Sequence, residues 1–308
     1  MTSAVVFAYH NVGVRCLSVL LAQGVDVKLV LTHEDSPEEN VWFGSVWNRA
    51  LEHGVPTVAP ADPNAADVLA RVRACEPDFL FSFYYRQMLK TPLLKSARHG
   101  AYNVHGSLLP KYRGRVPVNW AIIHGETETG ATLHAMIEKP DAGDIVDQIA
   151  VPILPDDTAH EVLEKVTVAA EMTLHRSLPA LLAGTAKLTP QDLSKGSYYG
   201  GRRPEDGAIA WTRSAREIHN LVRAVTRPYP GAFCDTAAGR LVVWRTLMAK
   251  KSAPGAAALM VENGGLLARC GDGGLLKVLD AELDGKALDA ETLNAKHGGM
   301  LALPEGPP

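Results

Sequence analysis

The sequence predicts a Rossmann-like domain with a mostly parallel sheet, followed by a small, mainly β domain of the OB-like barrel type. Short apolar runs alternate with helical patterns over residues 1–184, which is typical of a right-handed parallel α/β sheet. Residues 185–207 are polar and rich in Gly, Lys, Tyr and Arg, as expected for a linker. Residues 208–308 contain short strand-like runs separated by glycine-rich turns. We therefore expect two domains, over 1–184 and 208–308, joined by this linker.

The expected strands of the first domain are short apolar runs bounded by polar or turn-forming residues. In chain order they cover residues 4–9, 25–31, 56–59, 79–83, 101–104, 129–137 and 144–153. Between them, apolar residues recur at helical spacing, which predicts helices over 12–20, 43–52, 65–74, from about 118, and over 158–182. Only Gly13 follows the first strand, so the GxGxxG fingerprint of dinucleotide-binding enzymes is absent. This disfavours a nicotinamide oxidoreductase.

The second domain is expected to contain one helix and a series of short strands. Residues 208–211 follow the linker, the helix covers residues 215–224, and the strand candidates are 242–247, 257–261, 266–270 and 275–279. Short strands with glycine-rich turns at this spacing favour a small barrel.

Composition excludes several classes of protein. The net charge of −3 lacks the basic excess of a general nucleic-acid binder. The four cysteines form no CxxC pair and no metal-ligand spacing, so we expect reduced core thiols and no metal. The N-terminus lacks the basic and apolar regions of a signal peptide, and no stretch approaches about eighteen apolar residues. A cytoplasmic protein without membrane insertion is expected.

Residues 102–120, YNVHGSLLPKYRGRVPVNW, form the densest cluster of chemically active side chains. Asn103 and His105 are two residues apart, so in a strand both side chains point to the same side. An amide donor beside an imidazole suits acyl transfer, with the amide stabilising an oxyanion and the imidazole exchanging a proton. A solvated loop histidine and a turn-forming asparagine explain the spacing equally well. The basic loop that follows is typical either of a charged surface or of an anion-binding site.

A second cluster, MIEKPDAGDIV, covers residues 136–146. Asp141 lies in a turn bounded by proline and glycine, where an aspartate usually bonds its own backbone. Placed near His105, the same carboxylate would hold the tautomer of the imidazole and stabilise its charged form. The remaining histidines, His134 among them, share no metal-ligand spacing, and most are expected to be surface or structural residues.

Together these clusters resemble the formyltransferase family that uses 10-formyltetrahydrofolate. The family pattern is Asn-x-His, SLLPxxRG and Asp-x-Gly-Asp, and here it reads Asn103-Val-His105, SLLPKYRG over 107–114, and Asp141-Ala-Gly143-Asp144. The segments FAYHNVG, FSFYYR, HGETETG, GRRPEDG and PYPGAF are similar to one branch, the formyltransferase domain of bifunctional polymyxin-resistance proteins. The similarity extends from about residue 4 to about residue 280.

The resemblance implies that 1–184 is the catalytic domain and assigns roles to its residues. His105 would be the catalytic acid and base, Asn103 would stabilise the transition state, and Asp141 would stabilise the charged histidine. Residues implied to bind the co-substrate 10-formyltetrahydrofolate are Gln87, Met88, Leu89, Arg115, Ile137, Glu138, Lys139, Pro140 and Asp141. The implied acceptor is the 4-amine of UDP-4-amino-4-deoxy-L-arabinose, in lipid A modification and polymyxin resistance, and no metal is required.

Three alternatives remain open at this point. Methionyl-tRNA formyltransferases share the fold and the three catalytic residues, but residues 205–308 hold twelve Lys/Arg and twelve Asp/Glu, a balance that argues against a polyanionic acceptor. Another nucleotide-linked amino sugar is the second alternative, because the decarboxylase domain of the bifunctional proteins has no counterpart in this sequence. A non-enzymatic folate-binding module is the third. The oligomeric state is left open.

Overall fold

The computed structural model describes residues 1–35 and 40–306, which divide into two compact units. The first consists of Met1–Pro117, Glu128–Val151 and Leu163–Gly200, and the second of Val118–Thr127, Pro152–Val162 and Gly201–Pro308. The expected boundaries at 184 and 208 stay a prediction. The segment predicted to be a linker does more than connect, because its residues up to Gly200 belong to the first unit.

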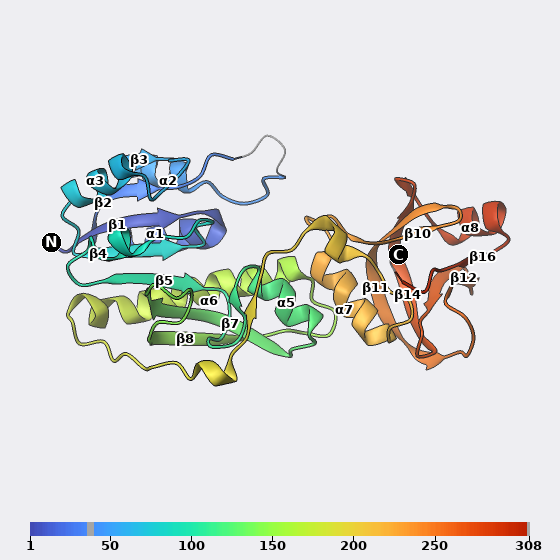
Figure 1. The fold of residues 1–308 in the computed structure, drawn as a ribbon. Helices are drawn as coiled ribbons and strands as arrows, with labels where there is room; N and C mark the ends of the chain where they lie inside the picture. Colours follow the sequence, from blue (N-terminus) through green and yellow to red (C-terminus); the bar gives the residue numbers. More distant parts are fainter. Residues whose placement is uncertain (36–39, 307–308) are drawn as a thin grey trace. The chain divides into compact units, whose positions relative to one another are not determined.

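The first unit is built on a mostly parallel sheet (Figure 1). Within the described residues the strand order is β3-β2-β1-β4-β5-β7-β8, with parallel pairing from β3 to β5 and antiparallel pairing of β5 with β7. The strands are β1 (Ser3–Ala8), β2 (Asp26–Leu31), β3 (Thr57–Val58), β4 (Phe79–Phe83), β5 (Ala101–His105), β7 (Glu128–Ala135) and β8 (Ile145–Pro152). A separate pair joins β6 (Arg113–Gly114) to β9 (Tyr198–Tyr199). The Rossmann-like α/β class is confirmed.

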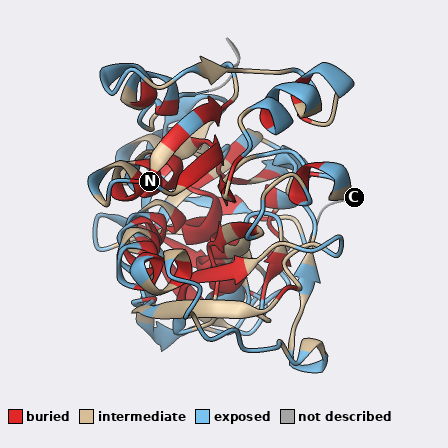
Figure 2. Cartoon of the chain, turned by 90° about the vertical axis from the view of Figure 1, so that its left-hand side faces the viewer, coloured by how far each residue is buried: buried red, intermediate tan, exposed pale blue. Residues whose placement is uncertain are grey.

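Alternation along the central strands explains the two cores of this unit. In β1, Val6 faces one apolar cluster and its neighbours Val5 and Phe7 face the other. Because both faces are covered, β1 and β4 are buried along their whole length, as is typical of parallel strands. Figure 2 shows the buried strands inside and the exposed sides of the helices outside.

The helices cover these two faces with their apolar sides. Buried residues of α1 and α6 join the first cluster, and those of α3 and α4 join the second. The bounds are α1 (His10–Ala22), α2 (Val46–Glu52), α3 (Ala66–Ala74), α4 (Thr91–Leu94) and α6 (Ala159–Leu182), which belongs to this unit from Leu163 on. Helix α5 (Pro117–Ile123) belongs to the second unit from Val118 on. The helix expected from residue 43 begins at Val46, because Ser45 caps it by accepting a hydrogen bond from the backbone N–H of Asn48 at 3.2 Å.

The second unit is an antiparallel sheet with a capped helix. Among the described residues the strands follow the path β10-β11-β14-β13-β12-β16, and β15 pairs with β14. The strands are β10 (Ala232–Thr236), β11 (Gly239–Ser252), β12 (Ala258–Glu262), β13 (Gly265–Arg269), β14 (Gly274–Leu283), β15 (Lys286–Ala287) and β16 (Met300–Ala302). The helices are α7 (Ala215–Val225), α8 (Ala290–His297) and the short 3₁₀ turn η2 (Pro204–Gly207), whereas the 3₁₀ turn η1 (Leu193–Lys195) belongs to the first unit. The mainly β character is confirmed.

Two details of the second unit follow from its sequence. Ser214 and Glu217 form a reciprocal capping box at the start of α7, which satisfies two backbone donors of the first turn. At the start of the domain, Ala208 makes an isolated bridge to Phe233. Among the described helices, none combines the length and the apolar character needed to cross a bilayer.

Candidate active site

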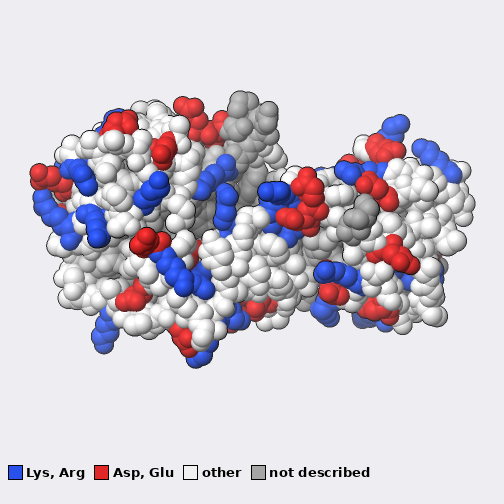
Figure 3. Space-filling model, viewed as in Figure 1, with Lys and Arg blue, Asp and Glu red and all other residues white. Residues whose placement is uncertain are grey.

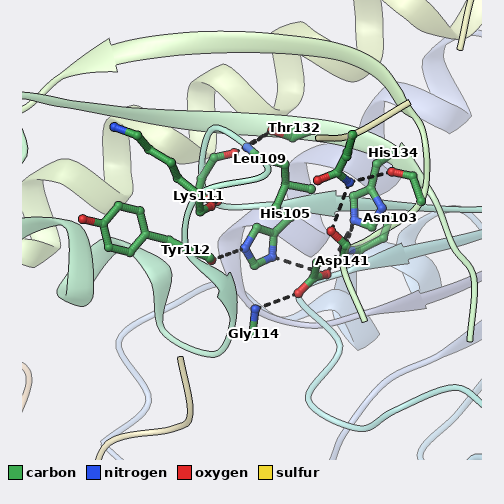
Figure 4. Close-up of polar contacts among 12 residues, drawn as sticks. Asn103, His105, Leu109, Lys111, Tyr112, Gly114, Thr132, His134 and Asp141 are labelled. Atoms are coloured by element: carbon green, nitrogen blue, oxygen red, sulfur yellow. Dashed lines mark hydrogen bonds and ion pairs between the residues drawn. The ribbon is translucent and has the colours of Figure 1, made fainter. Parts of the chain in front are cut away.

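Strand β5 presents Asn103 and His105 on one face of the sheet. His105 is the last residue of β5, at the carboxyl end of a strand that pairs in parallel with β4, where α/β sheets place their ligand sites. On the neighbouring strand β7, His134 lies opposite Asn103 and Thr132 lies opposite His105. Alternate residues of a strand share a face, so these four side chains lie on the same side (Figure 4).

The His105 imidazole is buried and held at both nitrogens (Figure 4). Its Nε2 lies 2.8 Å from the carbonyl oxygen of Tyr112, which can only accept a hydrogen bond. Nε2 therefore carries the proton of the neutral ring, and Nδ1 is left with its lone pair. That Nδ1 lies 3.6 Å from Oδ1 of Asp141, so a proton taken up there would face a carboxylate.

The Asp141 carboxylate is 14% exposed and lies between two histidines. Its Oδ1 is 3.6 Å from Nδ1 of His105 and 3.6 Å from Nε2 of His134, and its Oδ2 accepts a hydrogen bond from Gly114 N at 2.9 Å. Burial opposes ionisation, but His105, the neighbouring His134 and the Gly114 N–H together hold the pKa of Asp141 well below its usual range. The site therefore contains a fixed negative charge at neutral pH.

Two glycines explain the shape of the loops around this charge. Gly114 has φ +100, and a Cβ added there would collide with the carbonyl oxygen of Tyr199. A Cβ added to Gly143 would collide with the carbonyl oxygen of Ala135. The RG and AGD parts of the two sequence clusters thus permit close backbone approach.

Backbone strain accompanies this packing. Tyr112, which holds His105, has φ +56, and Asp141 has φ +50. Such conformations cost on the order of 1–3 kcal/mol each and persist only where the surroundings enforce them. The structure therefore maintains both partners of His105 in positions that the isolated chain would not favour.

The segment predicted to be a linker contacts both loops. The Gln191 amide donates to the carbonyl oxygens of Asp141 at 3.0 Å and of Gly143 at 2.6 Å. The Ser197 hydroxyl accepts from Tyr112 N at 2.9 Å, and β9 pairs with β6. Neither residue was a candidate in the sequence, because no motif marks them.

His134 is a site residue that sequence reasoning assigned to the structural histidines. It is 1% exposed, its Nε2 lies 3.1 Å from Nδ2 of Asn103, and its Nδ1 lies 2.9 Å from the carbonyl oxygen of Ala135. The only signal in the sequence was its position inside a predicted strand. The β5–β7 register, which pairs it with Asn103, comes from the fold.

The residues expected to bind a folate lie on three loops. Gln87, Met88 and Leu89 follow β4, Arg115 follows β6, and 137–140 follow β7. Leu89 is buried and shares an apolar cluster with Met136, the neighbour of Ile137. Met88 and Ile137 are large apolar side chains left 56% and 49% exposed.

A metal ion would need several His, Cys, Asp or Glu side chains placed close together. Within residues 1–35 and 40–306, no group of three or more His, Cys, Asp or Glu side chains is placed to hold a metal ion. Asp141 and its two histidines are instead engaged with each other and with backbone groups.

Comparison with known proteins places this geometry in a family. The formyl transferase model matches residues 21–178, and the model of the formyl transferase C-terminal domain matches residues 202–298. The structure is similar to an N-formyltransferase from Helicobacter canadensis in complex with folinic acid and dTDP-3-aminofucose, at 19% identity and TM-score 0.71, covering 90% of this chain and 99% of that one.

Two further structures show the same fold. The sugar 3N-formyltransferase WlaRD, in the presence of dTDP and 5-N-formyl-THF, is 20% identical with TM-score 0.68, covering 90% of this chain and 97% of that one. HypX from Aquifex aeolicus, in complex with tetrahydrofolic acid, is 16% identical with TM-score 0.63, and the match covers 96% of this chain but 46% of HypX. With the family model matched over more than half of its length, this chain belongs to the formyl transferase family.

Proposed function

We propose that this enzyme transfers the formyl group of 10-formyltetrahydrofolate to the amine of a nucleotide-linked amino sugar, UDP-4-amino-4-deoxy-L-arabinose. The observation that supports it best is the pairing of His105 Nδ1 with the buried, ionised carboxylate of Asp141, next to the Asn103 amide. The resemblance to polymyxin-resistance proteins favours this sugar and a role in lipid A modification. Structural relatives that hold folates with dTDP or a dTDP-amino sugar favour the same chemical class.

In this proposal the residues of the site divide the reaction between them. The free amine attacks the formyl carbon, and the carbonyl oxygen becomes an oxyanion, which an N–H of Asn103 stabilises. His105 Nδ1 takes the proton that the amine nitrogen loses and delivers it to N10 of the folate as the bond from the formyl carbon to N10 breaks. Asp141 stabilises the imidazolium in between. The products are the formamido sugar and tetrahydrofolate, and no step needs a metal.

The three loops named above are the proposed folate site. The exposed side chains of Met88 and Ile137 offer apolar surface to a planar ring, and the backbone groups of Gln87–Leu89 and 137–141 offer donors and acceptors to its polar edge. Arg115 is exposed and suited to the carboxylates of the glutamate tail.

Charge distribution supports a small acceptor. Acidic and basic side chains are interspersed over the face shown in Figure 3, and residues 205–308 are balanced at twelve of each sign. A tRNA acceptor would instead be expected to use a basic surface.

An acceptor panel tests the proposal. The purified chain, 10-formyltetrahydrofolate and one acceptor at a time are incubated, and tetrahydrofolate release and formylated product are measured. UDP-4-amino-4-deoxy-L-arabinose is expected to give the highest kcat/KM, above other nucleotide amino sugars and methionyl-tRNA. Turnover with methionyl-tRNA alone would contradict the acceptor but keep the chemistry, and folate binding without turnover of any acceptor would favour a binding module.

A further inference from the structure

The Asn103 carboxamide has two ends that differ in chemistry, and its function depends on which end faces His134. The NH₂ end donates two hydrogen bonds, whereas the oxygen only accepts. A stabiliser of an oxyanion must present an N–H. The partner that selects the orientation is therefore as important as Asn103 itself.

The contacts of His134 determine its tautomer. Its Nδ1 lies 2.9 Å from the carbonyl oxygen of Ala135, an obligatory acceptor, so Nδ1 carries the hydrogen. In the neutral ring Nε2 is then an acceptor, and it lies 3.1 Å from Nδ2 of Asn103. Asn103 donates one N–H to His134. No other partner of its second N–H exists among the described residues, so that N–H is left for a reacting oxygen.

The same bond decides which histidine uses the charge of Asp141. Oδ1 of Asp141 is equally distant, at 3.6 Å, from Nε2 of His134 and from Nδ1 of His105. A proton on Nε2 of His134 would place two donors face to face and break the bond to Asn103. With Nε2 of His134 accepting from Asn103, Asp141 receives no hydrogen from that ring, and its Oδ1 is left to face Nδ1 of His105.

We propose that His134 is a positioning residue for formyl transfer: it orients the Asn103 amide as a donor and leaves Asp141 to stabilise charged His105. Its expected effects on kinetics rest on the proposed function, whereas the tautomer of His134 and the orientation of Asn103 do not. Among the described residues, the charged group in contact with His134 is Asp141, in the loop after β7, whose Oδ1 also lies near Nδ1 of His105 on β5.

The first test reads the tautomers directly, without turnover. In the ¹⁵N-labelled full-length protein at neutral pH, NMR correlation of ring nitrogens with ring carbon-bound protons is expected to show Nδ1–H for His134 and Nε2–H for His105. Assignment uses His134→Gln and His105→Gln, each of which removes one set of signals. An Nε2–H tautomer at His134 would overturn the proposal, because Asn103 would then have to turn its oxygen toward the ring.

The second test separates positioning from a structural role. His134→Leu removes the acceptor, and its kcat is expected to fall about tenfold to a hundredfold, less than the 10²–10³-fold loss typical of deleting an oxyanion donor. KM for both substrates is expected to change less than about threefold, since the change acts in the transition state. His134→Gln can still offer an oxygen acceptor to Asn103, so it should recover part of kcat.

The matched control is His219, a buried histidine of the second unit whose nitrogens bond Thr246 and Pro155. His219→Gln is expected to lower Tm while kcat stays within about twofold, because the lost bonds are structural. A His134→Leu protein that keeps wild-type kcat would overturn the inference, as would an equal loss of kcat in His134→Gln. If wild-type protein formylates no acceptor, the proposed function fails, whereas the tautomer measurement still decides the role of His134.

Discussion

Two buried histidines of this molecule face an aspartate at almost the same distance, yet their surroundings differ. In the first unit, His105 Nδ1 lies 3.6 Å from Asp141, and in the second unit His219 Nε2 lies 3.4 Å from Asp156. Asp141 is 14% exposed, whereas Asp156 is 55% exposed. His219 also bonds Thr246 Oγ1 at 2.9 Å and the Pro155 carbonyl oxygen at 3.0 Å, so both of its nitrogens are engaged.

The difference indicates that exclusion of water, more than distance, distinguishes the proposed acid–base pair from a structural contact. A charge near bulk water is screened, and the interaction of two charges grows as the effective dielectric constant falls. Burial lowers the pKa of His219, with the positive charges of Arg223 and Arg216 in the same direction, against the Pro155 bond and Asp156. His219 is therefore a neutral structural residue, whereas His105 is set against a carboxylate that stays ionised.

The largest expected difference in kcat/KM is between substitutions of the two histidines. His105→Ala should lower kcat/KM at least about a hundredfold, because it removes the group that exchanges the proton. His219→Ala should leave kcat/KM within about twofold and lower Tm instead. Steady-state kinetics with thermal unfolding of both variants provides the check, and equal activities would remove the distinction between the two sites.

Substitution of Asp141 should lower kcat more than substitution of Asp156. Asp141→Asn keeps the shape of the side chain but removes the charge that stabilises the imidazolium, so kcat is expected to fall about tenfold to a hundredfold. The exposed Asp156 changed to Asn should have no effect beyond about twofold. Comparable losses in the two variants would show that burial is not what matters.

Acid should also affect the two regions in different pH ranges. The folded-state pKa of His219 lies below its unfolded value of about 6.5, so its contribution to stability is complete above that pH and declines as pH falls. The pKa of Asp141 is lowered from about 4, so its contribution persists to below pH 4. Urea unfolding at pH 7, 6 and 5 should show a smaller loss of free energy in His219→Gln than in wild type. The same change of unfolding free energy with pH in both proteins would refute the assignment of this loss to His219.

The smallest effect is expected at Gln191, which supports the Asp141 loop from outside it. Gln191→Ala removes two hydrogen bonds to backbone carbonyls, so Asp141 should be held less precisely and kcat/KM should fall about twofold to tenfold. The matched control is Gln148→Ala, which loses bonds to Leu109 and Thr132 in the same unit. Measuring kcat/KM of both variants at a single pH tests the difference. An unchanged kcat/KM in Gln191→Ala would show that the Asp141 loop keeps its position without the bonds of Gln191.

Prediction from sequence succeeded where the information is local. Apolar runs that alternate with helical patterns predicted β1, β4 and the helices that follow them. The prediction succeeded because the apolar residues that a strand buries are neighbours in its own sequence. The clusters around Asn103, His105 and Asp141 were consistent with acyl transfer and with ordinary loop residues, and the resemblance to the formyltransferase family favoured acyl transfer. Prediction from sequence left His134 among the surface or structural histidines, because its pairing with Asn103 depends on the register of β5 with β7.

By itself the sequence determined the α/β class and the mainly β second domain, and its motifs contain the residues that we propose for acid–base chemistry. Only the tertiary structure decided how they meet. His134 and Asn103 are separated by 31 positions and face each other only through the β5–β7 register. Gln191 and Ser197 reach the two loops from a segment that composition marks as a linker. The physical reason is that hydrogen bonds and electrostatic fields depend on distance in space and on exclusion of water, and residue order along the chain specifies neither.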